Sequence, residues 1–113
     1  MFGLFGDNME KVKKLIEKKK DAELAKLAEN KDQKVQLAAI AGLGKVRGEA
    51  SYNALVSLLR SPDPTIRAAV AGAMAEYNDP KLRAHIEHLL KSETDGKVTA
   101  ALHAALANIK GKN

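Results

Sequence analysis

The stretch PDPTIRAAVAGAMA, residues 62–75, decides the fold because related versions of it occur three times in the chain. It joins a proline-containing turn and an aspartate to an alanine-rich helix. Asp63 has counterparts in Asp32 and Asp95, at spacings of 31 and 32 residues. Each aspartate is followed three residues later by a β-branched apolar residue. A period near 30 residues is typical of repeat proteins in which helical hairpins stack into a solenoid.

Behind each branched residue, the same six positions carry apolar, alanine or glycine residues in all three copies. They fall at i, i+3, i+4, i+7, i+8 and i+11, which is one face of a helix. The three sets are Val35, Ala38, Ala39, Gly42, Leu43 and Val46; Ile66, Ala69, Val70, Ala73, Met74 and Tyr77; and Val98, Ala101, Leu102, Ala105, Leu106 and Ile109. We predict that these faces form the core, and that the alanines let neighbouring helices pack closely.

The composition of the chain favours one all-α domain over residues 1–113. Apolar residues make up 45% of the sequence and aromatic residues only 4%, and alanine and leucine supply most of the apolar share. Both are strong helix formers. The chain contains no cysteine, so disulfides and thiolate metal sites are excluded. The apolar leader MFGLF is too short for a signal peptide or a membrane span, and we expect a cytoplasmic location.

The repeat pattern divides the chain into a leader with a capping helix at 1–20 and three helical hairpins at 21–48, 49–79 and 80–110. Asp7 and Glu10 form a capping pair that predicts a helix start near Asn8. Ser51 is the expected cap of the second hairpin, and Pro64 opens its second helix. The predicted fold is a right-handed α–α superhelix of about seven helices.

The segments VQLAAIAGLG at 35–44 and IRAAVAGAMA at 66–75 resemble the second helix of a HEAT repeat, in the short form also found in phycobilin lyase subunits. The family pattern is an aspartate, a branched residue followed by arginine, and then an alanine run. Asp63, Ile66 and Arg67 match it best, whereas Gln36 and Thr99 replace the arginine in the other copies. The resemblance covers about 20–110 and implies an armadillo-like solenoid that serves as an interaction scaffold and not as an enzyme.

This resemblance implies that the second helices line a concave face that binds a protein or peptide partner. The predicted partner-binding strip consists of the residues placed outward on those helices: Gln36, Ile40, Arg67, Ala71, Thr99 and His103. In this register Ala69 belongs to the core and Ala71 to the surface. Arg67 has two possible roles, either reaching the aspartate of a neighbouring turn or anchoring a carboxylate or carbonyl of the partner.

A second predicted surface is the lysine-rich first helix. It comprises Lys11, Lys13, Lys14, Lys18, Lys19 and Lys20, and could bind nucleic acid or an anionic membrane surface. Interleaved acidic residues, such as Asp21 and Glu23, favour a solvated face instead. At the other end, Leu102, Leu106 and Ile109 precede no recognisable capping helix, which predicts weak self-association.

The sequence offers no catalytic residues, no cofactor site and no clear metal site. His85 and His88 lie three residues apart on a predicted helix, with His103 on another, so a shared metal is conceivable. Leu82 and Ile86 occupy the inward face of that helix, however, and we interpret the histidines as surface residues. No serine, threonine or lysine forms a recognisable nucleophile motif with a histidine and a carboxylate.

Overall fold

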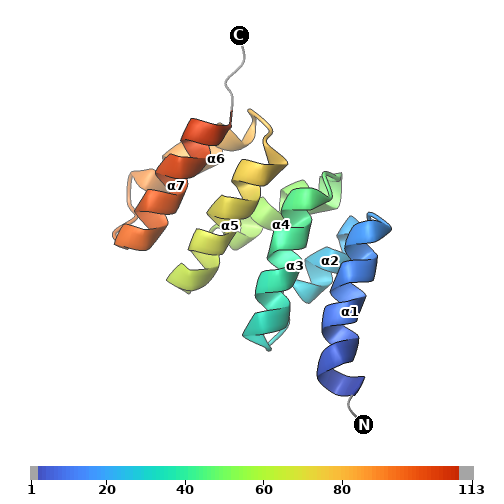
Figure 1. The fold of residues 1–113 in the computed structure, drawn as a ribbon. Coiled ribbons are helices and arrows are strands. Elements are labelled where there is room, and N and C mark those ends of the chain that lie inside the picture. The colour runs from blue at the N-terminus through green and yellow to red at the C-terminus, as the bar shows by residue number, and fades with distance from the viewer. Residues whose placement is uncertain (1–2, 110–113) are drawn as a thin grey trace.

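The computed structural model describes residues 3–109, with side chains from Asn8 to Ile109. Within that range it contains seven helices and no strand (Figure 1). They are α1 (Gly3–Glu17), α2 (Asp21–Leu27), α3 (Gln33–Lys45), α4 (Glu49–Leu58), α5 (Pro64–Tyr77), α6 (Leu82–Leu90) and α7 (Gly96–Asn108). The all-α fold of about seven helices is therefore confirmed.

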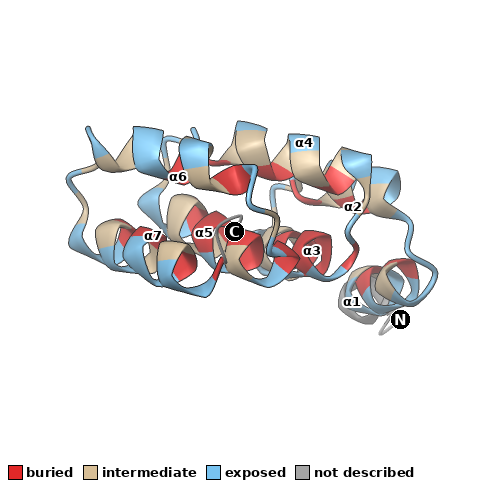
Figure 2. Ribbon diagram, turned by 90° about the horizontal axis from the view of Figure 1, so that it is seen from above, coloured by how far each residue is buried: buried red, intermediate tan, exposed pale blue. Residues whose placement is uncertain are grey.

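The helices form two layers (Figure 2). The first helices of the hairpins, α2, α4 and α6, make one layer, and the second helices, α3, α5 and α7, make the other together with α1. The molecule is elongated, with principal extents of 48 × 30 × 18 Å. The second helices pack against one another more extensively than the first helices do.

Aspartates begin all three second helices, as the repeat pattern predicts. The carboxylates of Asp32, Asp63 and Asp95 accept hydrogen bonds from the backbone N–H two residues further on, at 2.8–3.0 Å. Pro64 follows Asp63 in the first turn of α5, where its missing N–H costs no helical hydrogen bond. In each turn, the side chain two residues before the aspartate also accepts the aspartate's own N–H. The three acceptors are Asn30, Ser61 and Glu93.

Neighbouring repeats are also joined by hydrogen bonds at the ends of the second helices. At the N-terminal ends, Gln33 Nε2 donates to Asp63 Oδ2 of the next turn at 3.0 Å. At the C-terminal ends, Asn108 Nδ2 donates to the Ala75 carbonyl at 2.8 Å. The first bond joins α3 to the turn before α5, and the second joins α7 to α5.

The predicted cap at Ser51 is wrong. α4 starts two residues earlier, at Glu49, and the carboxylate of Asp21 accepts from the backbone N–H groups of Ala50 and Ser51 at 3.0 and 3.3 Å. Ser51 is fully buried, and its hydroxyl has no hydrogen-bond partner among the described residues. The cap thus comes from the preceding repeat, and a search for local sequence signals does not detect it.

The predicted start of the first helix is also wrong. α1 begins at Gly3, so Asp7 lies inside the helix and not before its first residue. Glycine costs a helix only about 1 kcal/mol relative to alanine, and no proline interrupts the leader. The helix ends in a Schellman turn, with Lys19 in the left-handed conformation at φ 56°. The N–H of Lys20 donates to the Leu15 carbonyl at 2.8 Å to close this turn.

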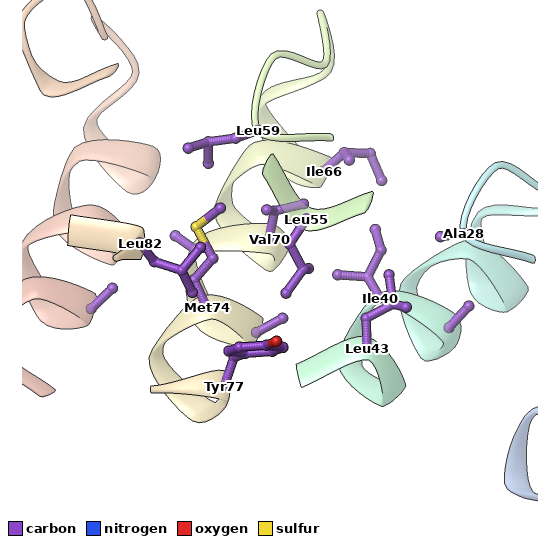
Figure 3. Close-up of a cluster of buried hydrophobic side chains, with 14 of the residues drawn as sticks. Ala28, Ile40, Leu43, Leu55, Leu59, Ile66, Val70, Met74, Tyr77 and Leu82 are labelled. Carbon is purple, nitrogen blue, oxygen red and sulfur yellow. The ribbon is translucent and has the colours of Figure 1, made fainter. Parts of the chain in front are cut away.

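The core contains two residues that the sequence places on the surface, Ile40 and Ala71. Both are fully buried (Figure 3 shows Ile40 beside Leu43 in the core). The side of α3 that carries Ile40 also carries Gly44, which lies against the backbone of Ala73 in α5. This column therefore faces the next repeat and not solvent. His103 takes the same position in the last described repeat and is exposed.

The C-terminal edge is better covered than the sequence predicts. Leu102 and Ile109 are buried and Leu106 is half-buried. Arg83 Nη1 helps to close the edge by donating to the carbonyls of Leu106 and Ile109 at 2.9 and 2.8 Å. The described residues thus lack the apolar edge from which we predict self-association, and the association itself stays a prediction.

Ala71 is more deeply buried than Ala69, which is the reverse of the register predicted from the sequence. Ala71→Leu is expected to destabilise the protein by about 1–3 kcal/mol, because the fully buried site has no room for three more carbons. Ala69 is half-buried, so Ala69→Leu should cost less. Urea unfolding of the two variants measures the difference. Equal losses, or a larger loss for Ala69→Leu, would contradict the register of α5.

Candidate partner-binding face

α3 and α5 each expose one narrow stripe, because the first helix of the same hairpin and two neighbouring helices cover the other sides, and α7 exposes the aligned positions. In α3 the stripe consists of Lys34, Leu37, Ala41 and Lys45, at i, i+3, i+7 and i+11. The aligned stripes of α5 and α7 are Thr65, Ala68, Gly72 and Glu76, and Lys97, Ala100, Ala104 and Asn108. We call these residues the second-helix face. Its members are exposed except for Leu37 and Ala68, which are half-buried.

The centre of the second-helix face is apolar and built almost wholly from small side chains. Its two central rows are Leu37, Ala68 and Ala100, and Ala41, Gly72 and Ala104. A Cβ added at Gly72 would meet nothing within 4 Å, so the space above the face is open. Small side chains let a partner come close to the helix backbones.

Polar side chains border this centre at both ends. Lys34, Thr65 and Lys97 form one border, and at the other Lys45 Nζ lies 3.4 Å from Glu76 Oε2. An apolar centre with a polar rim is the usual arrangement of a protein interface.

A hollow of about 670 Å³ opens on the same face, between the first turns of α5 and α7. Pro64, Thr65 and Ala68 line it from α5, and Asp95, Gly96 and Lys97 line it from the start of α7. Three of these residues belong to the second-helix face, so the hollow gives the flat surface one deeper point where a side chain could enter.

Arg67 links two turns of the fold. Its Nε and Nη2 donate to Oε1 and Oε2 of Glu93 at 2.8 and 2.9 Å, and its Nη1 donates to the Ser61 carbonyl at 2.8 Å. The Arg67 side chain is 17% exposed and that of Glu93 only 2%. Of the two roles considered for Arg67, these contacts match the structural one, but the partner is a glutamate and not an aspartate. The guanidinium is committed to the fold and is not the outward donor that a ligand anchor requires.

The pair shifts the pKa values of both groups. The hydrogen bonds from Arg67 hold the pKa of the Glu93 carboxyl below its usual range, although burial opposes this shift. The same hydrogen bonds raise the pKa of the Arg67 guanidinium. Two parallel hydrogen bonds between a guanidinium and a carboxylate are among the strongest polar contacts in proteins. Arg67 and Glu93 thus join the turn before α5 to the turn before α7.

The remaining residues of the predicted strip do not form one surface either. Gln36 and Thr99 are half-buried beside the exposed stripes, and Thr99 Oγ1 donates to the carbonyl of Asp95 at 3.0 Å. His103 is exposed on α7. The equivalent positions on α3 and α5 are Ile40 and Ala71, which are buried. None of the six predicted residues belongs to the second-helix face.

The structure separates the six predicted lysines into groups. Four of them, Lys11, Lys14, Lys18 and Lys20, line one hollow between α1 and the start of α2. Lys19 lines another hollow, beside Arg47. Lys13 lines neither of these two hollows, although it is exposed.

The three histidines lie in different surroundings. His85 is half-buried with its ring edge-on to Tyr52, at a centroid distance of 6.2 Å, whereas His88 is exposed on the same helix. His103 is exposed on α7. Among the described residues, no group of three or more histidine or carboxylate side chains could hold a metal ion. No helix in the described part of the chain is long and apolar enough to cross a bilayer.

Stacked antiparallel helix pairs, each with an aspartate-capped second helix, define the class of α-solenoid proteins. The family model for HEAT repeats matches residues 22–107, so the chain belongs to the HEAT-repeat family. Comparison with curated proteins and with solved structures gives no significant match. HEAT domains generally act as scaffolds for protein interactions and are typically not catalytic.

Proposed function

We propose that this chain is a cytoplasmic, non-catalytic adaptor that binds a protein partner through the second-helix face. The observation that carries the proposal is the alignment of three exposed stripes with small, apolar centres. Surface positions without a structural role are usually polar, whereas five of the six central residues here are alanine or glycine. Bulky apolar side chains of a partner helix or peptide would fill the space that these residues leave open.

The borders of the face favour a protein over a nucleic acid. Lys34 and Lys97 are the cations of one border, and Lys45 at the other is paired with Glu76. Nucleic-acid binding depends on many lysine or arginine contacts to phosphates. Lys34 and Lys97 form no ion pair with another described residue, and two such lysines beside an apolar centre fit a peptide with a few carboxylates better.

Arginine substitutions in the centre of the face test the proposal. Ala41→Arg combined with Ala104→Arg places two long charged side chains in the apolar rows without touching the core, since both alanines are exposed. The double variant is expected to bind a captured protein partner at least about tenfold more weakly than wild type. Affinity purification followed by titration with the purified partner measures the loss.

Ala84→Arg together with Ala22→Arg is the matched control, because both residues are exposed on helices of the first layer. This control should bind as wild type does. Salt provides a second check, because binding at an apolar surface weakens little as salt increases. Unchanged binding by the Ala41→Arg, Ala104→Arg variant would show that the partner does not bind the second-helix face.

The likeness of the short repeats to those of phycobilin lyase subunits stays a prediction. The adaptor proposal does not depend on this likeness, because the proposal rests on the exposed stripes of α3, α5 and α7.

A further inference from the structure

The lysine-lined hollow between α1 and α2 has a charge pattern that the adaptor role of the second-helix face does not explain. Its volume is about 420 Å³, and Lys11, Lys14, Lys18 and Lys20 line it. Leu15 lies among the lysines, and Glu10 and Glu23 complete the lining. We call this set the lysine hollow. Lys11, Lys14 and Lys18 follow one side of α1 over about 10 Å of helix.

Three arginines elsewhere in the chain are committed to the fold. Arg67 binds Glu93, Arg83 binds two carbonyls of the last helix, and Arg47 Nε donates to the Tyr77 carbonyl at 2.8 Å. The ion pairs found among the described residues are Lys45–Glu76, Arg67–Glu93 and Arg83–Glu87. None of them includes a lysine of the lysine hollow, so no described carboxylate oxygen lies within 4.0 Å of the Nζ of these four lysines. These four ammonium groups face solvent and can take external anions.

We propose that the lysine hollow binds an acidic amphipathic segment of a protein. Carboxylates of the segment would pair with Lys11, Lys14 and Lys18, and an apolar side chain would cover Leu15 and the lysine stems. The aliphatic part of a lysine side chain packs readily against apolar groups while its ammonium stays in water. The hollow thus matches carboxylates and an apolar group at the same time.

The carboxylates in the lining argue against a nucleic acid. Glu10 and Glu23 would face an unbroken row of phosphates, whereas a peptide can place an uncharged or basic residue there. The described residues of the lining include no arginine and no aromatic residue, so they offer neither bidentate phosphate contacts nor a stacking surface for bases.

This proposal stands apart from the adaptor proposal. The lysine hollow lies between α1 and α2, whereas the second-helix face lies on α3, α5 and α7. Substitutions on one surface leave the other intact, so one proposal can fail while the other holds.

A fluorescent peptide of about 15 residues, with glutamate and leucine at helical spacing, is a suitable probe. The full chain should bind it, and the Lys11→Gln, Lys14→Gln, Lys18→Gln variant should bind about tenfold more weakly or worse. The matched control, Lys26→Gln, Lys31→Gln, Lys91→Gln, removes three exposed lysines elsewhere and should stay within about twofold of wild type. The Ala41→Arg, Ala104→Arg variant should bind the peptide normally.

Thermal melts of the same samples establish that every variant is folded. Equal loss in both lysine variants would overturn the proposal, because net charge alone would then explain the binding. Absence of peptide binding at millimolar concentration would also overturn it. Tighter binding of duplex DNA or of phosphatidylserine vesicles than of the peptide would reject an acidic protein segment and assign the surface to a phosphate-bearing partner.

Discussion

Replacing Gly44 with alanine is expected to destabilise the protein by about 2–3 kcal/mol, because α3 and α5 touch at this point. A Cβ on Gly44 would lie 2.6 Å from the carbonyl oxygen of Ala73 and 3.0 Å from its Cα. Both are backbone atoms of α5 and cannot turn aside as a flexible side chain can. The two helices would have to separate, and the core between them would lose contacts.

Gly72→Ala is the matched control for this prediction. Gly72 also lies inside a second helix, but a Cβ there would meet nothing within 4 Å. Alanine favours a helix over glycine, so this variant should gain about 0.5–1 kcal/mol of stability. Urea denaturation gives the free energy of unfolding of both variants, which should change in opposite directions relative to wild type. An increase in stability for Gly44→Ala would contradict the close approach of α3 to the backbone of α5 at Ala73.

Arg67→Ala should lower the thermal midpoint by about 10 °C. The substitution leaves the carboxylate of Glu93 nearly buried without its main partner, and an uncompensated buried charge is costly. It also removes the donor to the Ser61 carbonyl. Arg67→Lys should recover only part of the loss, because an ammonium group cannot make two parallel hydrogen bonds to Glu93. Differential scanning calorimetry gives the midpoints, and an unchanged midpoint for Arg67→Ala would contradict a structural role.

The same pair predicts a dependence of stability on pH. The pKa of Glu93 is lower in the folded protein than in the unfolded chain, where a glutamate titrates near about 4.3. The pair therefore stabilises the fold above that pH, and this stabilisation is lost as the pH falls through the folded pKa. Glu93→Gln removes the titrating group, so the free energy of unfolding of this variant should fall less than that of wild type between about pH 5 and pH 2. If the free energy of unfolding falls equally with pH in both proteins, the ionisation of Glu93 does not contribute to stability as predicted.

Local signals predicted much of the fold from the sequence. Asp63 and Pro64 mark a helix start through their own chemistry, and the repeated aspartates carry the same information to the other hairpins. The alignment of three copies then fixed the number of helices. Interactions between distant residues were not predictable in this way. Asp21 caps α4 from the preceding repeat, and Glu93 meets Arg67 across a turn that contains one extra residue.

The strip predicted from the sequence and the proposed second-helix face lie on the same helices but on different sides of them, and two residues of the predicted strip, Ile40 and Ala71, are buried. A single amphipathic helix buries about half of its surface, and this expectation placed Ile40 and Ala71 outside. A second helix in a stack is covered on three sides, so its buried arc is wider and its exposed stripe is narrower. The sequence contained the relevant signal, because the column of Ala41, Gly72 and Ala104 is small in all three copies.

Methyl NMR of alanine-labelled protein tests most directly whether the second-helix face binds the partner. The chain carries alanine methyls on the face, at Ala41, Ala68, Ala100 and Ala104, and exposed alanines on the first layer, at Ala22 and Ala84. Addition of the captured partner is predicted to shift or broaden the methyl signals of the four face residues and to leave those of Ala22 and Ala84 unchanged. Perturbation of Ala22 or Ala84 without any change at Ala41 and Ala104 would contradict the proposed binding face.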